Sequence, residues 1–357
     1  MKYRIITLFL ILSHLSQLAF GQKITNPESI VYDKVKDRYI VSDPGGPAII
    51  AIASNGTKTI LHEQGLFFPR GATIVGNILF VNDLGKVLGF DLTTDQLVID
   101  TIIPGAQGLN DIVADDKGNL YMSDDVLNQI FKFEIADTVG YAWITAGIDA
   151  PNGMYFDKAN NRLVLVSFID DSPIQAINLT TKAVSTIKNT TLDLLDGIAV
   201  DKNGNYYISS WGTNKIYRYN SNFDWEKEFS TGHDGPADIL FVPEKDLLAV
   251  PNMNKGTIDF IPVSTVSVKE NLSSEDYHVN VYASPAKDEI ILDFTLEKPA
   301  VIGVELVNVS AKTTQKIASE TFFDGVHQIG IPTDGKKGVF IVRLIIDGKP
   351  VVRKVNL

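Results

Sequence analysis

Cysteine is absent from the 357 residues of this chain. The absence excludes disulfide bonds and leaves no thiolate ligand for a soft-metal site. Stability must therefore come from the burial of apolar side chains, and the chain is long enough to form two hydrophobic cores. Any metal site would have to use other ligands.

Positive charge is also scarce. Lys and Arg total 32 against 43 Asp and Glu, which gives a formal net charge of −11 and a pI near 4.9. This balance disfavours nucleic acid and anionic membrane surfaces as partners, and it is compatible with a protein that binds cations. Beyond the N-terminus no apolar run approaches the roughly 20 residues that a membrane-spanning helix needs, so no membrane span is expected.

Sustained helical periodicity and the G-x-S-x-G motif of serine hydrolases are missing too. The first absence favours an all-β repeat region, and the second disfavours a Ser-His-Asp hydrolase. At the N-terminus, Lys2 and Arg4 precede an apolar run over residues 5–12, and Ala19-Phe20-Gly21 offers small residues at the positions that a signal peptidase reads. Residues 1–21 are therefore predicted to be a signal peptide, so that the chain is exported.

Six stretches of the chain start alike at intervals of 40 to 44 residues. Repeats of this length, each with about four short strands, are typical of a β-propeller. In the fifth repeat, for example, Lys202-Asn203-Gly204-Asn205 is a hairpin turn between two apolar runs. Residues 22–268 are thus predicted to be a six-bladed β-propeller. The six starts are Pro27-Glu28-Ser29-Ile30, Pro69-Arg70-Gly71-Ala72, Leu109-Asn110-Asp111-Ile112, Pro151-Asn152-Gly153-Met154, Leu195-Asp196-Gly197-Ile198 and Pro236-Ala237-Asp238-Ile239.

The second residues of these starts should converge, because the first strand of each propeller blade lines the central channel. Two carboxylates and two amides on one axis form a hard-oxygen site, which selects Ca²⁺ or Mg²⁺. The alternative is a channel whose polar groups are satisfied by water, with Arg70 neutralising Glu28. The second residues are Glu28, Arg70, Asn110, Asn152, Asp196 and Ala237. The ends of the second strands should rim the same mouth, and they are Asp43, Asp83, Asp124, Ser210 and Asn252.

Three short motifs carry a family resemblance: Pro27-Glu28, Pro151-Asn152-Gly153 and Asp196-Gly197-Ile198-Ala199-Val200-Asp201. In these motifs residues 27–263 resemble the regucalcin/gluconolactonase (SGL) family of six-bladed propellers. The resemblance implies one divalent cation, held by Glu28, Asn152 and Asp196. It implies Ca²⁺ in the first place, with Mg²⁺, Mn²⁺ or Zn²⁺ as alternatives.

The match also has departures. Asn110-Asp111 matches the family's substrate-side motif, although Ile112 replaces its Gly. The family's Glu-Gly-Pro is Glu28-Ser29-Ile30 here, and Gly108 stands where the family's sugar lactonases have Arg. Metal binding is therefore better supported than specificity for a sugar lactone.

The resemblance implies a secreted hydrolase of a lactone or related ester, in which the cation polarises the carbonyl and activates a water molecule. Asp196 would be the catalytic residue, as a ligand that also accepts the water proton. Four residues at the mouth would bind substrate: Asn110, Arg70, Asp124 and His233. His233 is also a candidate proton carrier, or else a solvated loop histidine. The alternative function is a non-catalytic NHL-type propeller that binds a glycan, peptide or protein, with the cation only structural.

After the repeats, a polar stretch over residues 269–276 is predicted to be a linker, and alternating runs over residues 277–357 predict a small β-sandwich. The motifs of this segment are Val281-Tyr282-Ala283-Ser284-Pro285, Phe294-Thr295-Leu296-Glu297-Lys298, Gly338-Val339-Phe340-Ile341-Val342-Arg343-Leu344, Gly348-Lys349 and Lys354-Val355. They resemble the C-terminal sorting domain of the bacterial type IX secretion system. The resemblance implies passage through the periplasm, the type IX machinery as a partner, and release or attachment at the cell surface. The alternative is a generic carbohydrate-binding or spacer sandwich.

Overall fold

The computed structural model describes residues 23–224, 226–263, 279–284, 289–308, 313–335 and 338–356. The chain divides into two compact units, Met1–Val263 and Ser264–Leu357. The predicted signal peptide (1–21) and linker (269–276) lie outside the described residues. Apart from a single 3-10 turn, Lys158–Asn160, all regular secondary structure among the described residues is β-strand. The all-β prediction is thus confirmed.

The first unit contains six antiparallel sheets that follow one another along the chain, each with its strands in sequence order. The first three sheets are β1 (Ile30–Asp33), β2 (Arg38–Asp43), β3 (Ala48–Ala53) and β4 (Lys58–His62); β5 (Pro69–Val75), β6 (Ile78–Asp83), β7 (Lys86–Asp91) and β8 (Gln96–Ile102); and β9 (Leu109–Ala114), β10 (Asn119–Asp124), β11 (Gln129–Glu134) and β12 (Val139–Ile144). The next three are β13 (Pro151–Asp157), β14 (Arg162–Ser167), β15 (Ile174–Asn178) and β16 (Val184–Lys188); β17 (Leu195–Val200), β18 (Tyr206–Ser210), β19 (Lys215–Tyr219) and β20 (Glu226–Thr231); and β21 (Leu240–Val242), β22 (Leu247–Asn252) and β23 (Thr257–Pro262).

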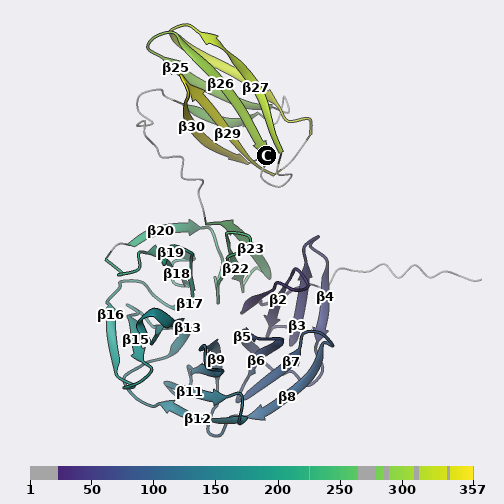
Figure 1. Cartoon of the computed structure of the whole chain (residues 1–357), viewed down its shortest axis with the longest axis vertical. Helices are drawn as coiled ribbons and strands as arrows, with labels where there is room; N and C mark the ends of the chain where they lie inside the picture. Colours follow the sequence, from purple (N-terminus) through teal and green to yellow (C-terminus); the bar gives the residue numbers. More distant parts are fainter. Residues whose placement is uncertain are drawn as a thin grey trace, which may run out of the picture. The chain divides into compact units, whose positions relative to one another are not determined.

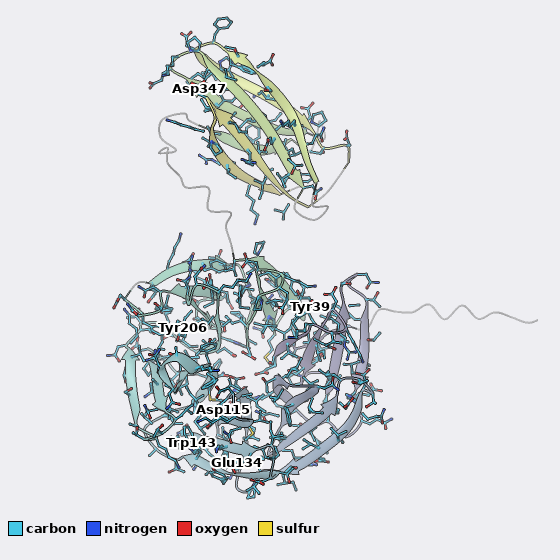
Figure 2. The ribbon with its side chains drawn as sticks, in the orientation of Figure 1. Tyr39, Asp115, Glu134, Trp143, Tyr206 and Asp347 are labelled. Carbon is cyan, nitrogen blue, oxygen red and sulfur yellow. The ribbon has the colours of Figure 1, made fainter. Side chains whose placement is uncertain are left out.

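These six sheets are arranged around a common centre, with β5, β9, β13 and β17 innermost (Figure 1). Each innermost strand contacts that of the next sheet, and β21 of the sixth sheet contacts β1 of the first. Six hydrophobic clusters lie between neighbouring sheets, including one that joins Ile30 and Tyr39 to Val242 and Ala249. Tyr39, Trp143 and Tyr206, labelled in Figure 2, belong to three of these clusters. The sheets therefore form a ring that is held by apolar packing between its members.

The sixth sheet differs from the others, because it has three strands among the described residues. Its innermost strand is interrupted: Pro236 pairs with Asn252 as an isolated bridge before β21 begins. Ile24 is 1% exposed and packs in the cluster between the sixth and first sheets. The N-terminal end of the described chain thus contributes to the junction where the ring closes.

The second unit has two antiparallel sheets that share one hydrophobic core. Alternate side chains of β26 and β29, such as Ile302 and Leu344, face Leu292 and Phe294 of β25 in that core. The strands are β24 (Asn280–Ser284), β25 (Glu289–Leu296) and β28 (Gly325–Pro332) in one sheet, and β27 (Thr313–Phe322), β26 (Ala300–Asn308), β29 (Val339–Ile346) and β30 (Lys349–Asn356) in the other. Within the described part of the chain, no helix is long and apolar enough to cross a membrane.

Candidate functional site

The leading positions of sheets two to five lie in β-bulges. In each innermost strand two residues stand opposite one residue of the second strand, as Asn110 and Asp111 stand opposite Ser123. A bulge bends the strand and redirects its side chains, and bulges are frequent beside active sites. The four bulged pairs are Arg70-Gly71, Asn110-Asp111, Asn152-Gly153 and Asp196-Gly197.

Glycine follows the leading residue where neighbouring innermost strands approach most closely. A Cβ atom on Gly153 would overlap the carbonyl oxygen of Asp196, and one on Gly71 would overlap that of Asn110. Because glycine has no Cβ, the backbones can come this close. The bulge and the glycine together allow the leading side chains to gather at one end of the ring.

Serine side chains of the second strands accept backbone N–H groups next to the leading residues in sheets one, three and five. The N–H groups of Ser29, Asp111 and Gly197 donate to the hydroxyls of Ser42, Ser123 and Ser209 at 3.0, 3.0 and 2.7 Å. A buried N–H group without such a partner would be costly. The serines therefore help to hold the leading residues of these three sheets in place, and those of the third and fifth sheets lie in bulges.

Four of the leading residues are polar and buried, and we call them the central cluster: Glu28, Asn110, Asn152 and Asp196, with 5%, 3%, 4% and 5% exposed. Oε2 of Glu28, Oδ1 of Asn110 and Oδ1 of Asp196 are buried and accept no hydrogen bond. Buried polar atoms normally have a partner, so three such oxygens from three sheets indicate a group that the protein alone does not supply.

Burial raises the pKa values of the two carboxyl groups in the central cluster. Burial, with the negative charge of Asp196, raises the pKa of Glu28 well above its usual value, and Arg70 only partly opposes this shift. Burial raises the pKa of Asp196 to about 7, against the opposing effect of Arg70. Since burial without a counter-charge favours the protonated forms, a bound cation would lower both pKa values.

Two further carboxyl groups lie in the same region. Burial raises the pKa of Asp111 to about 6, although its carboxylate accepts the N–H groups of Met154 and Ile112, both at 2.6 Å. Burial, together with Asp111, raises the pKa of Asp238 well above its usual value, and its Oδ2 accepts the hydroxyl of Ser29 at 2.6 Å. Asp111 and Asp238, each the third residue of its repeat start, thus link neighbouring sheets by hydrogen bonds.

The residues present fit a hard divalent cation. Within the described ranges no three His, Asp or Glu side chains are grouped closely enough to hold a metal, so amide oxygens would have to complete the ligand set. Glu28 and Asp196 offer carboxylate oxygens, and the buried Asn152 offers an amide oxygen. Carboxylate and amide oxygens suit Ca²⁺ or Mg²⁺.

Arg70 forms an ion pair with Asp125 rather than with Glu28. Its Nη1 lies 3.0 Å from Oδ2 of Asp125, and its guanidinium lies 5.1 Å from the centre of the Phe68 ring. The same carboxylate oxygen accepts the side-chain N–H of Asn110 at 3.2 Å. Arg70 therefore leaves the carboxylates of the central cluster without an ion pair, and Asp125 links it to Asn110.

The model of the SMP-30/gluconolactonase/LRE-like region matches residues 26–249. The chain belongs to this family. The family resemblance noted in the sequence is thereby confirmed. No curated protein matches the chain in sequence.

Solved structures of gluconolactonase-like proteins share the fold. A gluconolactonase from Xanthomonas campestris is similar over 67% of this chain and 86% of its own, with 16% identity and a TM-score of 0.57. A candidate gluconolactonase is similar over 65% of this chain and 89% of its own, with 15% identity and a TM-score of 0.54. At these identities the likeness establishes a gluconolactonase-like fold and nothing more.

Within this gluconolactonase-like unit, Asp124 does not face substrate as expected. It is 0% exposed, and its carboxylate accepts the N–H groups of Gln107, Gly108 and Leu127 at 2.8, 3.1 and 2.9 Å. Asp43 and Asp83 hold the loops that enter sheets one and two in the same way. An aspartate that ends a second strand therefore fixes the approach to its own first strand, and the prediction of a substrate contact is wrong.

His233 also differs from expectation. Its Nδ1 lies 3.0 Å from Oδ2 of Asp259 on β23, and its Nε2 lies 3.0 Å from Oγ of Ser230 on β20. Both partners belong to the outermost strands of their sheets, and His233 is 6% exposed. It is thus a buried residue between the fifth and sixth sheets. It is neither a proton carrier at the central cluster nor a solvated loop histidine.

Proposed function

We propose that the first unit is a six-bladed β-propeller that hydrolyses a lactone or related ester with the help of one divalent cation. The observation that carries the proposal is the set of buried, unpartnered oxygens on Glu28, Asn110 and Asp196. Membership of the SMP-30/gluconolactonase/LRE-like family supports the reaction class. Glu28, Asn152 and Asp196 would hold the cation, which when bound polarises the substrate carbonyl and acidifies a water molecule.

The residues of the chain would do the remaining work. Asp196 would accept the proton of the attacking water, because its buried carboxylate is one of the proposed ligands and a carboxylate can act as a general base. Asn110, whose Nδ2 donates to Asp125, keeps its Oδ1 available for a polar group of the substrate. Arg70 would lie beside the reacting ester, with its charge shared with Asp125.

A cation titration of the full mature chain tests this proposal. Metal content and calorimetric Ca²⁺ titration would be measured for the wild type, for Asp196→Ala and for Asp137→Ala, a control at an exposed turn. A panel of lactones and esters would then be assayed with each protein. We expect 1:1 cation binding and hydrolysis to be lost together in Asp196→Ala and retained in Asp137→Ala.

The other outcomes are informative. If the wild type binds no stoichiometric cation, the oxygen atoms only line a channel and the proposal fails. If a cation binds tightly but no lactone or ester is hydrolysed, the protein is a binding module of the NHL type. An Asp196→Ala protein with full activity would place the chemistry elsewhere.

We also propose that the second unit is a β-sandwich that acts as a type IX sorting domain, so that the protein is secreted or held at the cell surface after passage through the periplasm. Support comes from the sequence motifs, two of which form the paired strands β29 and β30, joined at Asp347-Gly348. Deletion of residues 277–357 in a bacterium with this secretion system should leave the protein in the periplasm. Unchanged export of the truncated protein would contradict the assignment.

A further inference from the structure

A surface pocket of about 350 Å³ opens beside the central cluster, in the second and third sheets. Its polar side is formed by Arg70 and Asp125, and Asp125 is hydrogen-bonded to Asn110 of the central cluster. The pocket is therefore connected to the central cluster through this hydrogen bond. Its volume falls within the range of about 300–1,000 Å³ that is usual for small-molecule sites.

The other side of the pocket is apolar and open to solvent. Phe68, Leu84 and Val126 line it, with 36%, 44% and 62% of their surface exposed. Three large apolar side chains exposed around one cavity indicate a binding surface, because single exposed apolar residues are ordinary but grouped ones are not.

Two backbone features hold these side chains at the pocket. Leu84 has a φ of +57°, in the left-handed region that a branched side chain occupies only at a cost. A Cβ atom at Gly108 would lie 2.5 Å from Cγ2 of Val126, so the glycine leaves the space that Val126 occupies. Leu84 thus lines the pocket in a strained backbone conformation, and the glycine at position 108 leaves room for Val126 beside it.

We infer that this pocket binds an alkyl or aryl substituent of the substrate, so that a lactone or ester with an apolar substituent is preferred to one without it. The inference depends on the proposed function for its site, since the pocket adjoins the residues assigned to the reaction. Arg70, Asp125 and Gln107 form the polar side of the pocket, and the facing wall is apolar. An apolar substituent would remove Phe68, Leu84 and Val126 from water.

Lactams, which resist hydrolysis, separate this inference from the proposed reaction. Five-membered lactams with hydrogen, propyl or hexyl at the same ring carbon would be titrated into the full chain with Ca²⁺ present, and the matching lactones would be assayed for hydrolysis. We expect affinity to rise about two- to fourfold per methylene until the pocket is filled. Hydrolysis of the lactones should favour the longer substituents in the same order.

A matched pair of variants locates the effect. Leu84→Asn suits the left-handed backbone and removes the apolar group, whereas Leu97→Asn removes a leucine of similar exposure, 49%, from the outer strand β8. Leu84→Asn should weaken hexyl-lactam binding about fivefold or more, and Leu97→Asn should leave it unchanged.

Each result decides one question. Affinity that increases with chain length and falls in Leu84→Asn supports the inference, even if no lactone is hydrolysed and the proposed reaction fails. Affinity independent of chain length, equal effects of the two variants, or no lactam binding at all would overturn the inference. Hydrolysis of lactones without preference for a substituent would leave the proposed reaction standing alone.

Discussion

Cation binding should release protons at neutral pH. Burial raises the pKa of Asp196 to about 7, so that about half of the unliganded protein carries a proton there at pH 7. Glu28, whose pKa is raised well above its usual value, would retain up to one proton more. A cation that binds both carboxylates must displace these protons. We therefore expect the release of between about 0.5 and 1.5 protons per cation at pH 7.

Calorimetry measures this release directly. Ca²⁺ would be titrated into the full chain at pH 6.5, 7.0 and 7.5 in two buffers with different ionisation enthalpies, and the difference in apparent enthalpy gives the number of protons. Because the affinity changes with pH by the same number, the association constant should rise about 3- to 30-fold from pH 6.5 to 7.5. Asp196→Asn, which carries no ionisable group at this position, should release about half a proton less at pH 7 and bind more weakly.

Stability should follow the same linkage with a definite sign. The pKa of Asp196 is raised from 3.8 when the chain folds, so its protonated form stabilises the unliganded fold at low pH. That contribution is lost as the pH rises through about 7. The melting temperature of the chelator-treated protein should thus fall between pH 5 and 8, and Ca²⁺ should restore it at pH 8.

The calorimetric experiment can refute the reasoning. An apparent enthalpy of Ca²⁺ binding that is identical in both buffers would mean that the carboxyl groups are ionised before the cation binds.

Three substitutions test the parts that position the site. Ser209→Ala removes the acceptor of the Gly197 N–H group and should lower the free energy of unfolding by about 1–3 kcal/mol in urea denaturation. Gly153→Ala would force a methyl group against the carbonyl of Asp196, so it should cost about 1–3 kcal/mol and weaken Ca²⁺ binding in calorimetry. Asp124→Ala removes the acceptor of three backbone N–H groups and should destabilise the protein by about 2–3 kcal/mol. Its Ca²⁺ dissociation constant should stay unchanged, and a large change there would show that Asp124 belongs to the site after all.

The repeat and its leading residues could be predicted from the sequence, because a period of 40 to 44 residues and an Asn-Gly turn such as Asn203-Gly204 are local signals. The bulges could not. Whether Asn152 and Gly153 stand opposite one residue or two depends on the register with β14, and that register is set by packing across the sheet. The role of Ser209 could not be predicted either, because its partner, the N–H group of Gly197, lacks a ladder partner only once the bulge is known.

The error on Asp124 has a related cause. Its place at the end of a second strand was sound, but an aspartate there can face the channel or turn toward the N–H groups of its own loop. The second arrangement satisfies three donors at once, and Asp43 and Asp83 repeat it. Asp125, one residue further on, points instead to Arg70. The recurrence of aspartate in three repeats was the available signal of a structural role, whereas a site residue differs from one repeat to the next.

Charge accounting explains why the central cluster needs an external partner. Four carboxyl groups, three of them buried and one half-buried, have raised pKa values, and Arg70 is already paired with Asp125. Buried carboxylates without a counter-charge are costly, so each group must take up a proton or share a cation. Asp111 and Asp238 accept hydrogen bonds that join neighbouring sheets, so their carboxyl groups already have partners within the protein. Glu28 and Asp196 each have one oxygen that accepts no hydrogen bond. We therefore place the proposed cation between these two residues.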